Sequence, residues 1–197
     1  MAIPSIAPIV LASGSPRRRQ LLEWAELPFT VIVSDADESF PSGTPPAEAA
    51  VMVAMAKARA VQGLEAYLTI PGRPSILAAD TMVVLDADII GKPLHRADAI
   101  QTLSRLSGRK HEVVTGVVIL HGDDVIHFHD STSVWFHDIT KEAIEHYVDH
   151  YAPYDKAGAY AIQEWIGVVG LRRIEGDFYN VMGLPVSRVV DAFRRLY

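Results

Sequence analysis

The chain has 197 residues, of which 49% are hydrophobic and 21% charged, so it is long enough to bury a sizeable core as one domain over residues 1–197. Its formal net charge of −6 argues against a protein that binds nucleic acid through its overall field. The absence of cysteine excludes disulfides, thiolate catalysis and Cys-based metal sites. We find neither a signal-peptide pattern nor a membrane-spanning apolar run, and expect a cytoplasmic protein with no nucleic-acid or membrane partner.

The N-terminal segment predicts a strand, a tight loop and a helix. Residues 9–12 are apolar, Ser15 is the expected N-cap, and Pro16 occupies the expected first helical position. Three consecutive arginines then fall in the first turn, where the helix dipole disfavours each cation by about 0.3–1 kcal/mol. A bound polyphosphate would reverse this cost. Successive helical residues point roughly 100° apart, so we assign Arg17 and Arg18 to an anionic ligand and the third arginine to solvent. A merely basic surface helix is the alternative.

The remaining chain alternates helical and strand patterns. We predict a strand at 29–34, a helix at 47–62, a hairpin of strands 76–85 and 89–92, a helix at 96–107, a second hairpin of strands 112–120 and 125–136, a helix capped by Thr140 that reaches about residue 151, loop with short strands over 155–177, and a last helix opened by residues 183–185. This order indicates an α/β or α+β fold around a mixed sheet.

Asp80 and Thr81 interrupt the apolar strand 76–85. A buried aspartate is rare unless it is paired. Antiparallel register places both residues roughly opposite 92–94, which makes Lys92 a candidate partner. A carboxylate in this setting could accept a proton from water or hold a divalent cation, whereas a plain buried ion pair is the alternative.

An acidic cluster of Asp35, Asp37 and Glu38 follows the strand 29–34. Magnesium binds through one or two carboxylates and keeps water and phosphate oxygens as its other ligands. We take Glu38 as the best candidate for this role, and a solvated acidic loop as the alternative. Lys57, within a small and apolar helix, is equally open to a functional or a structural interpretation.

Two histidine pairs could suggest a metal site. His146 and His150 have the spacing of a zinc motif, but tyrosine replaces its catalytic glutamate; His127 and His129 share a strand face and are better explained as exposed side chains. The chain also lacks the glycine-rich signatures of P-loop and Rossmann nucleotide sites and the nucleophile elbow of serine hydrolases.

Seven segments in order resemble the Maf-like nucleotide pyrophosphatases: LASGSPRRRQLL, DESF, AADTMVV, GKP, LSGRKHEVVTGV, DKAGAYAIQ and GDFYNVMGLP. The resemblance extends from residue 11 to residue 185. It implies an α/β fold with a mixed β-sheet flanked by helices, an elongated two-lobed single domain with a central cleft, related to the inosine triphosphate pyrophosphatases. It also implies a homodimer that hydrolyses a nucleoside triphosphate to the monophosphate and pyrophosphate with a divalent metal cation, Mg²⁺ or Mn²⁺.

Within that family, Arg17, Thr81 and Gln163 match the branch that acts on dTTP and UTP, and modified pyrimidine nucleotides remain open as substrates. The sister branch, which acts on 7-methyl-GTP, differs at these places and is one alternative. Another is a nucleotide-binding regulator of cell division, because the family is tied to arrest of septum formation.

The resemblance also implies the site roles. Asp80 aligns with the catalytic base, and Glu38 and Asp80 would hold the metal. Four further positions would bind substrate phosphates: Ser13, Arg18, Lys57 and Lys92.

Overall fold

The structure is a computed structural model, and it describes residues 7–196. The ends of the predicted 1–197 domain, residues 1–6 and 197, lie outside the described residues. The chain divides into two compact units. Unit 1 contains the described residues up to Asp80, together with Thr115–Asp130 and those from Gly183 onward, and unit 2 contains Thr81–Val114 and Ser131–Met182.

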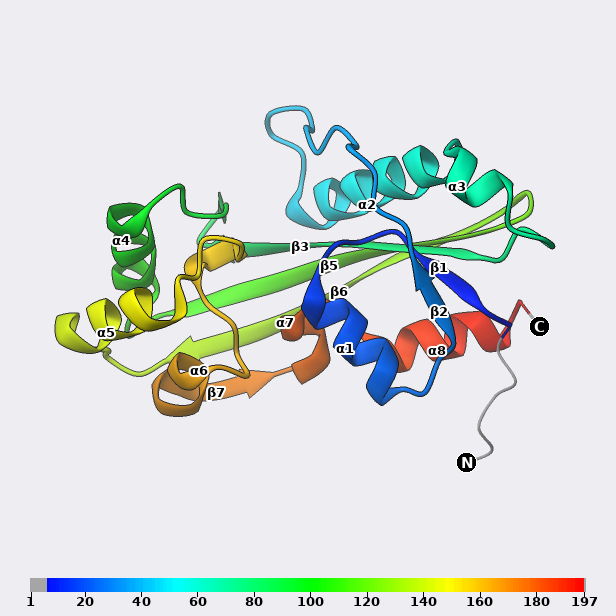
Figure 1. The fold of residues 1–197 in the computed structure, drawn as a ribbon. Coiled ribbons are helices and arrows are strands. Elements are labelled where there is room, and N and C mark those ends of the chain that lie inside the picture. The colour runs from blue at the N-terminus through cyan, green and yellow to red at the C-terminus, as the bar shows by residue number, and fades with distance from the viewer. Residues whose placement is uncertain (1–6, 197) are drawn as a thin grey trace. The chain divides into compact units, whose positions relative to one another are not determined.

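A seven-stranded mixed sheet is the framework of the chain (Figure 1). The strand order is β2-β1-β3-β5-β6-β7, and β4 pairs with β3. Strand β1 runs parallel to both β2 and β3, whereas β3–β4 and β6–β7 are antiparallel. The fold is therefore the predicted α/β type with a mixed sheet flanked by helices.

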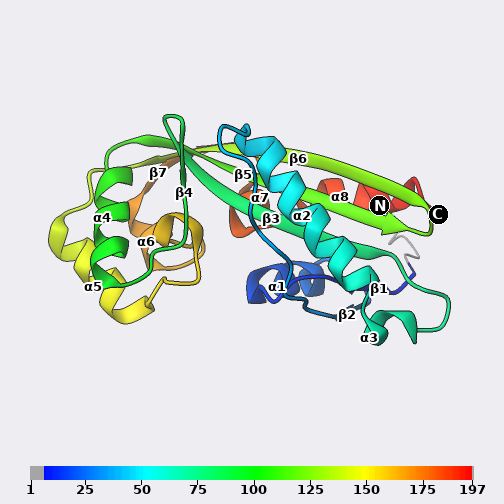
Figure 2. The ribbon, with the colours of Figure 1, turned by 90° about the horizontal axis from the view of Figure 1, so that it is seen from above.

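Unit 1 holds the N-terminal elements and the last helix. Its elements are β1 (Ile9–Leu11), α1 (Pro16–Trp24), β2 (Phe29–Val31), α2 (Pro46–Gln62), α3 (Glu65–Leu68), the first part of β3 (Ile76–Leu85), parts of β5 (Lys110–His121) and β6 (Asp124–Phe136), and α8 (Val186–Arg194). Within this unit, α2 lies across one face of the sheet, and α1 and α8 lie on the other (Figures 1 and 2).

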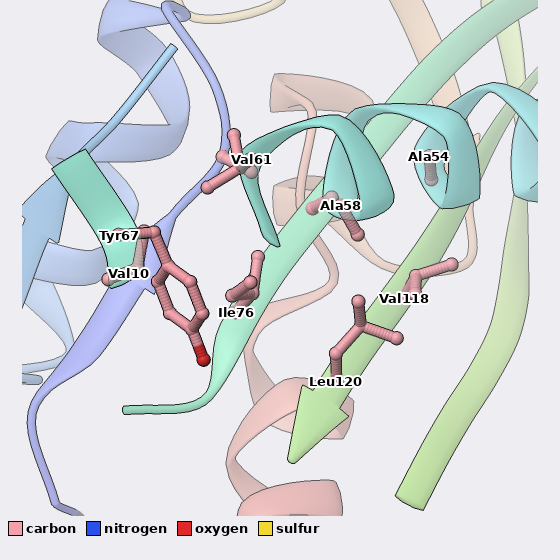
Figure 3. Close-up of a cluster of buried hydrophobic side chains, with 10 residues drawn as sticks. Val10, Ala54, Ala58, Val61, Tyr67, Ile76, Val118 and Leu120 are labelled. Atoms are coloured by element: carbon pink, nitrogen blue, oxygen red, sulfur yellow. The ribbon is translucent and has the colours of Figure 1, made fainter. Parts of the chain in front are cut away.

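The core of unit 1 forms where α2 meets the sheet. Figure 3 shows Ala54 and Ala58 of α2 beside Ile76 of β3 and Val118 of β5, all fully buried. Small alanine side chains allow the helix backbone to approach the strands closely. At Gly116 of β5 an added Cβ would lie 2.3 Å from the carbonyl carbon of Ala50, so this contact requires glycine.

Unit 2 holds the β3–β4 hairpin and the middle helices. Its elements are the remainder of β3, β5 and β6, with β4 (Asp88–Ile90), α4 (Arg96–Leu106), α5 (Lys141–Tyr151), η1 (Ala157–Ala159), α6 (Trp165–Gly170), β7 (Leu171–Glu175) and α7 (Phe178–Met182). Helices α4 and α5 pack together, and Arg96 of α4 donates two hydrogen bonds to Asp149 of α5, at 2.6 and 2.8 Å.

Most predicted elements are confirmed within one to three residues at each end. The strand predicted at 76–85 has those bounds, and Thr140 caps α5 by accepting a hydrogen bond from the backbone N–H of Ala143. The prediction of loop and short strands over 155–177 is wrong for α6, and α3 and α7 were not predicted. No helix within residues 7–196 is long and apolar enough to span a membrane.

Candidate active site

Lys57 and Asp80 meet because α2 crosses the face of β3 that carries Asp80. Side chains alternate along a strand, so Asp80 continues the row of Ile76 and Ala78, both buried against α2. Lys57 follows Ala54 of the same core by three residues, which places it on the same side of the helix. The Lys57 ammonium donates a hydrogen bond of 2.7 Å to Oδ1 of Asp80. Both side chains are largely buried, with exposed fractions of 14% and 17%.

Glu38 contributes a second carboxylate to the same lysine. It lies in the loop between β2 and α2, and its Oε1 is 3.0 Å from Nζ of Lys57. The neighbouring Asp37 is used differently: its carboxylate accepts hydrogen bonds from the backbone N–H and the hydroxyl of Ser39. These bonds lower the pKa of Asp37. The structure therefore selects Glu38 from the predicted acidic cluster as the residue that joins Lys57 and Asp80.

The carboxylates of Glu38 and Asp80 are the type of ligand that divalent cations such as Mg²⁺ bind. Oxygens of Glu38 and Asp80 already converge on one positive group, the ammonium of Lys57. Within residues 7–196, no group of three or more His, Asp or Glu side chains could hold a metal ion. A cation held here would take its remaining ligands from water and substrate phosphate, as magnesium commonly does. The metal site stays a prediction.

Arg18, in the first turn of α1, is hydrogen-bonded to the loop that precedes this helix. It is only 8% exposed; its Nε donates to the carbonyl oxygen of Gly183 at 2.8 Å, and its Nη1 donates to Oγ of Ser13 at 3.0 Å. Burial lowers the pKa of Arg18, whereas the negative charges of Asp80 and Glu38 act in the opposite direction. Arg18 thus links Ser13, in the loop before α1, to the backbone at Gly183. The carboxylates of Asp80 and Glu38 are close enough to act electrostatically on its guanidinium.

The start of α1 differs from the sequence prediction in one detail. Ser15 has the extended backbone of an N-cap, but its side chain makes no capping hydrogen bond. The hydrogen bond formed at this position is a different one, in which the backbone N–H of Ser15 donates to Oγ of Ser13 at 3.3 Å. Arg17 is half-buried and Arg19 is exposed, so the assignment of the third arginine to solvent is confirmed.

Three predicted site residues belong to unit 2. Thr81 is the half-buried residue after Asp80 in β3, and Lys92 is exposed beyond the end of β4. The last paired residues of the β3–β4 hairpin are Val83 and Ile90, so the paired part of the hairpin does not reach Lys92. The cation that is hydrogen-bonded to Asp80 is Lys57. Sequence reasoning missed this pairing. The roles of Thr81 and Lys92 stay predictions.

Gln163, the third of these residues, lies in a turn before α6. The backbone N–H of Glu164 donates to the carbonyl of Ala161 at 3.0 Å and closes this turn around Gln163. The Oε1 atom of Gln163 is buried and accepts no hydrogen bond from residues 7–196. A buried amide oxygen without a donor is costly, which makes it a candidate acceptor for a ligand N–H.

The histidine pairs are surface features. His146 and His150 are exposed on α5 with ring centroids 4.1 Å apart, and Nδ1 of His150 lies 2.7 Å from the carbonyl oxygen of His146. His127 and His129 are exposed on β6, as the sequence analysis favoured.

The fold and the cluster define an α/β protein in which two carboxylates and a lysine lie near a basic helix start. A family model described as Maf-like protein matches residues 8–196, and the chain belongs to this family. The sequence resemblance is thereby confirmed.

Several relatives named dTTP/UTP pyrophosphatase are similar to this chain. The protein from Cytophaga hutchinsonii is 42% identical over 189 residues, which cover 96% of this chain and 84% of the relative. The protein from Porphyromonas gingivalis is 44% identical over 189 residues, covering 94% and 92%. The protein from Symbiobacterium thermophilum is 44% identical over 183 residues, covering 93% and 91%.

Among solved structures, the Ham1 protein of Staphylococcus aureus aligns with a TM-score of 0.41 and 16% identity, covering 66% of this chain and 72% of that one.

Proposed function

We propose that this chain hydrolyses dTTP and UTP to the nucleoside monophosphate and pyrophosphate with the help of a divalent cation. The observation that carries the proposal is the cluster in which Lys57 contacts both Asp80 and Glu38. A pure binder of polyanions gains nothing from two carboxylates unless they hold a cation or act on water. The names of the relatives support the choice of substrates.

In the proposed reaction, Asp80 positions a water molecule and accepts its proton. The water oxygen attacks the α-phosphorus, and the bond from that phosphorus to the α,β-bridging oxygen breaks. Pyrophosphate leaves with the electron pair of that bond. Lys57 orients Asp80 before the reaction, since its ammonium donates directly to Oδ1.

Glu38 and Asp80 would hold Mg²⁺ or Mn²⁺. The bound cation would supply charge neutralisation at the phosphate oxygens. The protein cations assigned to the same task are Arg17, Arg18, Lys57 and Lys92, with Ser13 as a hydroxyl donor. Electrostatic stabilisation of this kind is large, and loss of one donor typically costs about 10² to 10³ in rate.

We assign recognition of the base to Thr81 and Gln163. Uracil and thymine present an N3–H donor, for which the buried Oε1 of Gln163 is a matching acceptor. Cytosine presents an unprotonated N3 there, which cannot donate to that oxygen. The same imide edge is present in modified pyrimidines such as 5-methyl-UTP, so the proposal covers these substrates as well.

The test is release of pyrophosphate, measured with Mg²⁺ or Mn²⁺, from dTTP, UTP, CTP, dATP, GTP and 7-methyl-GTP. We expect selective turnover of dTTP and UTP and no turnover by Asp80→Asn. Asp86→Asn is the matched control, because Asp86 lies in the exposed β3–β4 turn with φ +58°, where asparagine is well tolerated. Preference for 7-methyl-GTP would contradict the assignment of Arg17, Thr81 and Gln163. Binding without turnover of any nucleotide would instead indicate a regulator.

We extend the proposal to a homodimer that acts in the cytoplasm, as the family resemblance implies. Light scattering of the purified protein tests the first part, and fractionation of the source cells tests the second. A monomer at micromolar concentration, or enrichment in the membrane fraction, would contradict the corresponding part.

A further inference from the structure

One tyrosine hydroxyl holds both ends of the turn that carries Gln163. The hydroxyl of Tyr147, on α5, donates a hydrogen bond to Oε2 of Glu164. The same oxygen accepts a hydrogen bond of 3.3 Å from the backbone N–H of Ala161. Ala161 and Glu164 are the first and last residues of the turn closed by their backbone hydrogen bond. Gln163 therefore lies between two residues, Ala161 and Glu164, that are both hydrogen-bonded to the hydroxyl oxygen of Tyr147.

Glu164 is also tied to a buried lysine. Nζ of Lys156 is 3.5 Å from Oε1 of Glu164 and 2.8 Å from Oδ1 of Asp155, and Lys156 is only 7% exposed. A charge at this depth requires its partners, since an unpaired buried ammonium is strongly disfavoured. The two oxygens of the Glu164 carboxylate thus face different groups, the hydroxyl of Tyr147 and the ammonium of Lys156.

The backbone around the turn leaves little room for another arrangement. At Gly167, a Cβ would lie 1.9 Å from the carbonyl oxygen of Ile162, so α6 packs directly against the turn. On its N-terminal side, the hydroxyl of Tyr160 lies 2.8 Å from Nε2 of His111, and both side chains are buried. The chain is thus held on either side of the turn, and the Tyr147–Glu164 contact fixes the last residue of the turn.

We infer that Tyr147 and Glu164 are positioning residues that set the selectivity of the enzyme by fixing Gln163. This inference rests on the function proposed above. Neither residue needs to touch the substrate. Loss of the contact would let the Gln163 amide sample other orientations and would weaken discrimination between bases, while the machinery at Asp80 keeps its own contacts to Lys57.

The experiment measures kcat/KM for dTTP and for CTP in wild type, Tyr147→Phe, Glu164→Ala, Gln163→Ala and the double variant Y147F/Q163A. We expect the dTTP-to-CTP ratio to fall about tenfold in Tyr147→Phe and Glu164→Ala, the scale of one or two lost hydrogen bonds. In the double variant the ratio should equal that of Gln163→Ala alone. Tyr151→Phe is the matched control, because Tyr151 is an exposed residue of the same helix that stacks on Tyr147.

Melting temperatures of all variants separate positioning from unfolding, and the two single variants provide independent tests. An unchanged ratio in both Tyr147→Phe and Glu164→Ala, with a reduced ratio in Gln163→Ala, would overturn this inference and leave the proposed function intact. Additive losses in the double variant would overturn it too, because the tyrosine would then act independently of Gln163. A wild-type protein without preference for dTTP would overturn the proposed function and this inference together.

Discussion

The ammonium of Lys57 lies 2.7 Å from Oδ1 of Asp80, so a cation already neutralises the carboxylate assigned as catalytic base. Glu38 lies 3.0 Å from the same ammonium. Without Lys57, the two carboxylates would lose the ammonium that they share. Lys57 therefore has two roles: it stabilises the folded protein, and it positions both carboxylates of the proposed site.

Lys57→Met should lower the free energy of unfolding by about 1–2 kcal/mol, because it leaves the largely buried carboxylate of Asp80 without its lysine partner. Turnover of dTTP should fall by about 10² to 10³. Because the lysine no longer competes for the carboxylates, added Mg²⁺ should raise the melting temperature of the variant more than that of the wild type. The measurement is thermal unfolding with and without Mg²⁺.

The control for that experiment is Lys110→Met, since Lys110 is exposed and 3.5 Å from Glu112. It should melt near the wild type and respond equally to Mg²⁺. Equal responses to Mg²⁺ in Lys57→Met and wild type would contradict a metal site at Glu38 and Asp80.

Arg18→Lys should damage both stability and activity, although the charge is kept. The guanidinium reaches Gly183 and Ser13 with different nitrogens at once, and an ammonium cannot reproduce that geometry. We expect a loss of about 1–2 kcal/mol in the free energy of unfolding, measured by urea titration. Arg19→Lys, on the exposed side of the same helix, should match the wild type. Equal stability of the two variants would show that these hydrogen bonds contribute little.

The sequence predicted the sheet better than the small helices. Strand β3 is a continuous apolar run ending at a turn, and its bounds follow from that pattern alone. Helix α6 carries two glycines and two valines, residues with low helix propensity, so its pattern favours a loop or strand. The glycine at position 167 lets α6 lie directly against the carbonyl of Ile162 in the preceding turn, a contact that helix propensity does not include.

The candidate site was predictable by residue type, but its pairing was not. A lone aspartate in an apolar strand predicts a partner, yet hairpin register pointed to Lys92, whereas the hydrogen-bonded cation is Lys57 on α2. That contact depends on how a helix crosses a sheet, which the sequence pattern leaves open. The bond from Arg18 to Gly183 spans 165 residues of sequence and is equally non-local.

Gly116→Ala should destabilise the protein strongly, because the new methyl carbon would lie 2.3 Å from the carbonyl carbon of Ala50 and 2.4 Å from the backbone nitrogen of Val51. Helix α2 would have to move away from β5, at a cost of roughly 1–3 kcal/mol or more. Gly91→Ala is the matched control, since a Cβ there meets no atom within 4 Å. Urea titration of both variants is the measurement. Similar midpoints would contradict the close packing of α2 on the sheet.

His111 should make the protein sensitive to mild acid. It is 2% exposed, its ring packs edge-on against Phe136 and Tyr160, and its Nδ1 makes no hydrogen bond to the described residues. Burial lowers the pKa of His111 from an ordinary value of 6.5 to about 4. Between these two values the unfolded chain binds a proton that the folded protein does not, so the free energy of unfolding falls as the pH is lowered through this window.

The pKa difference corresponds to a loss of about 3 kcal/mol, complete near pH 4 and absent above pH 6.5. His111→Gln has no such proton to bind. We therefore expect the stability advantage of wild type over His111→Gln to be largest at neutral pH and to shrink steadily between pH 6.5 and pH 4, as measured by urea titration at each pH. Other titrating groups affect both proteins and cancel in this difference. An advantage that stays constant over that range would show that His111 is protonated in the folded protein as readily as in the unfolded chain.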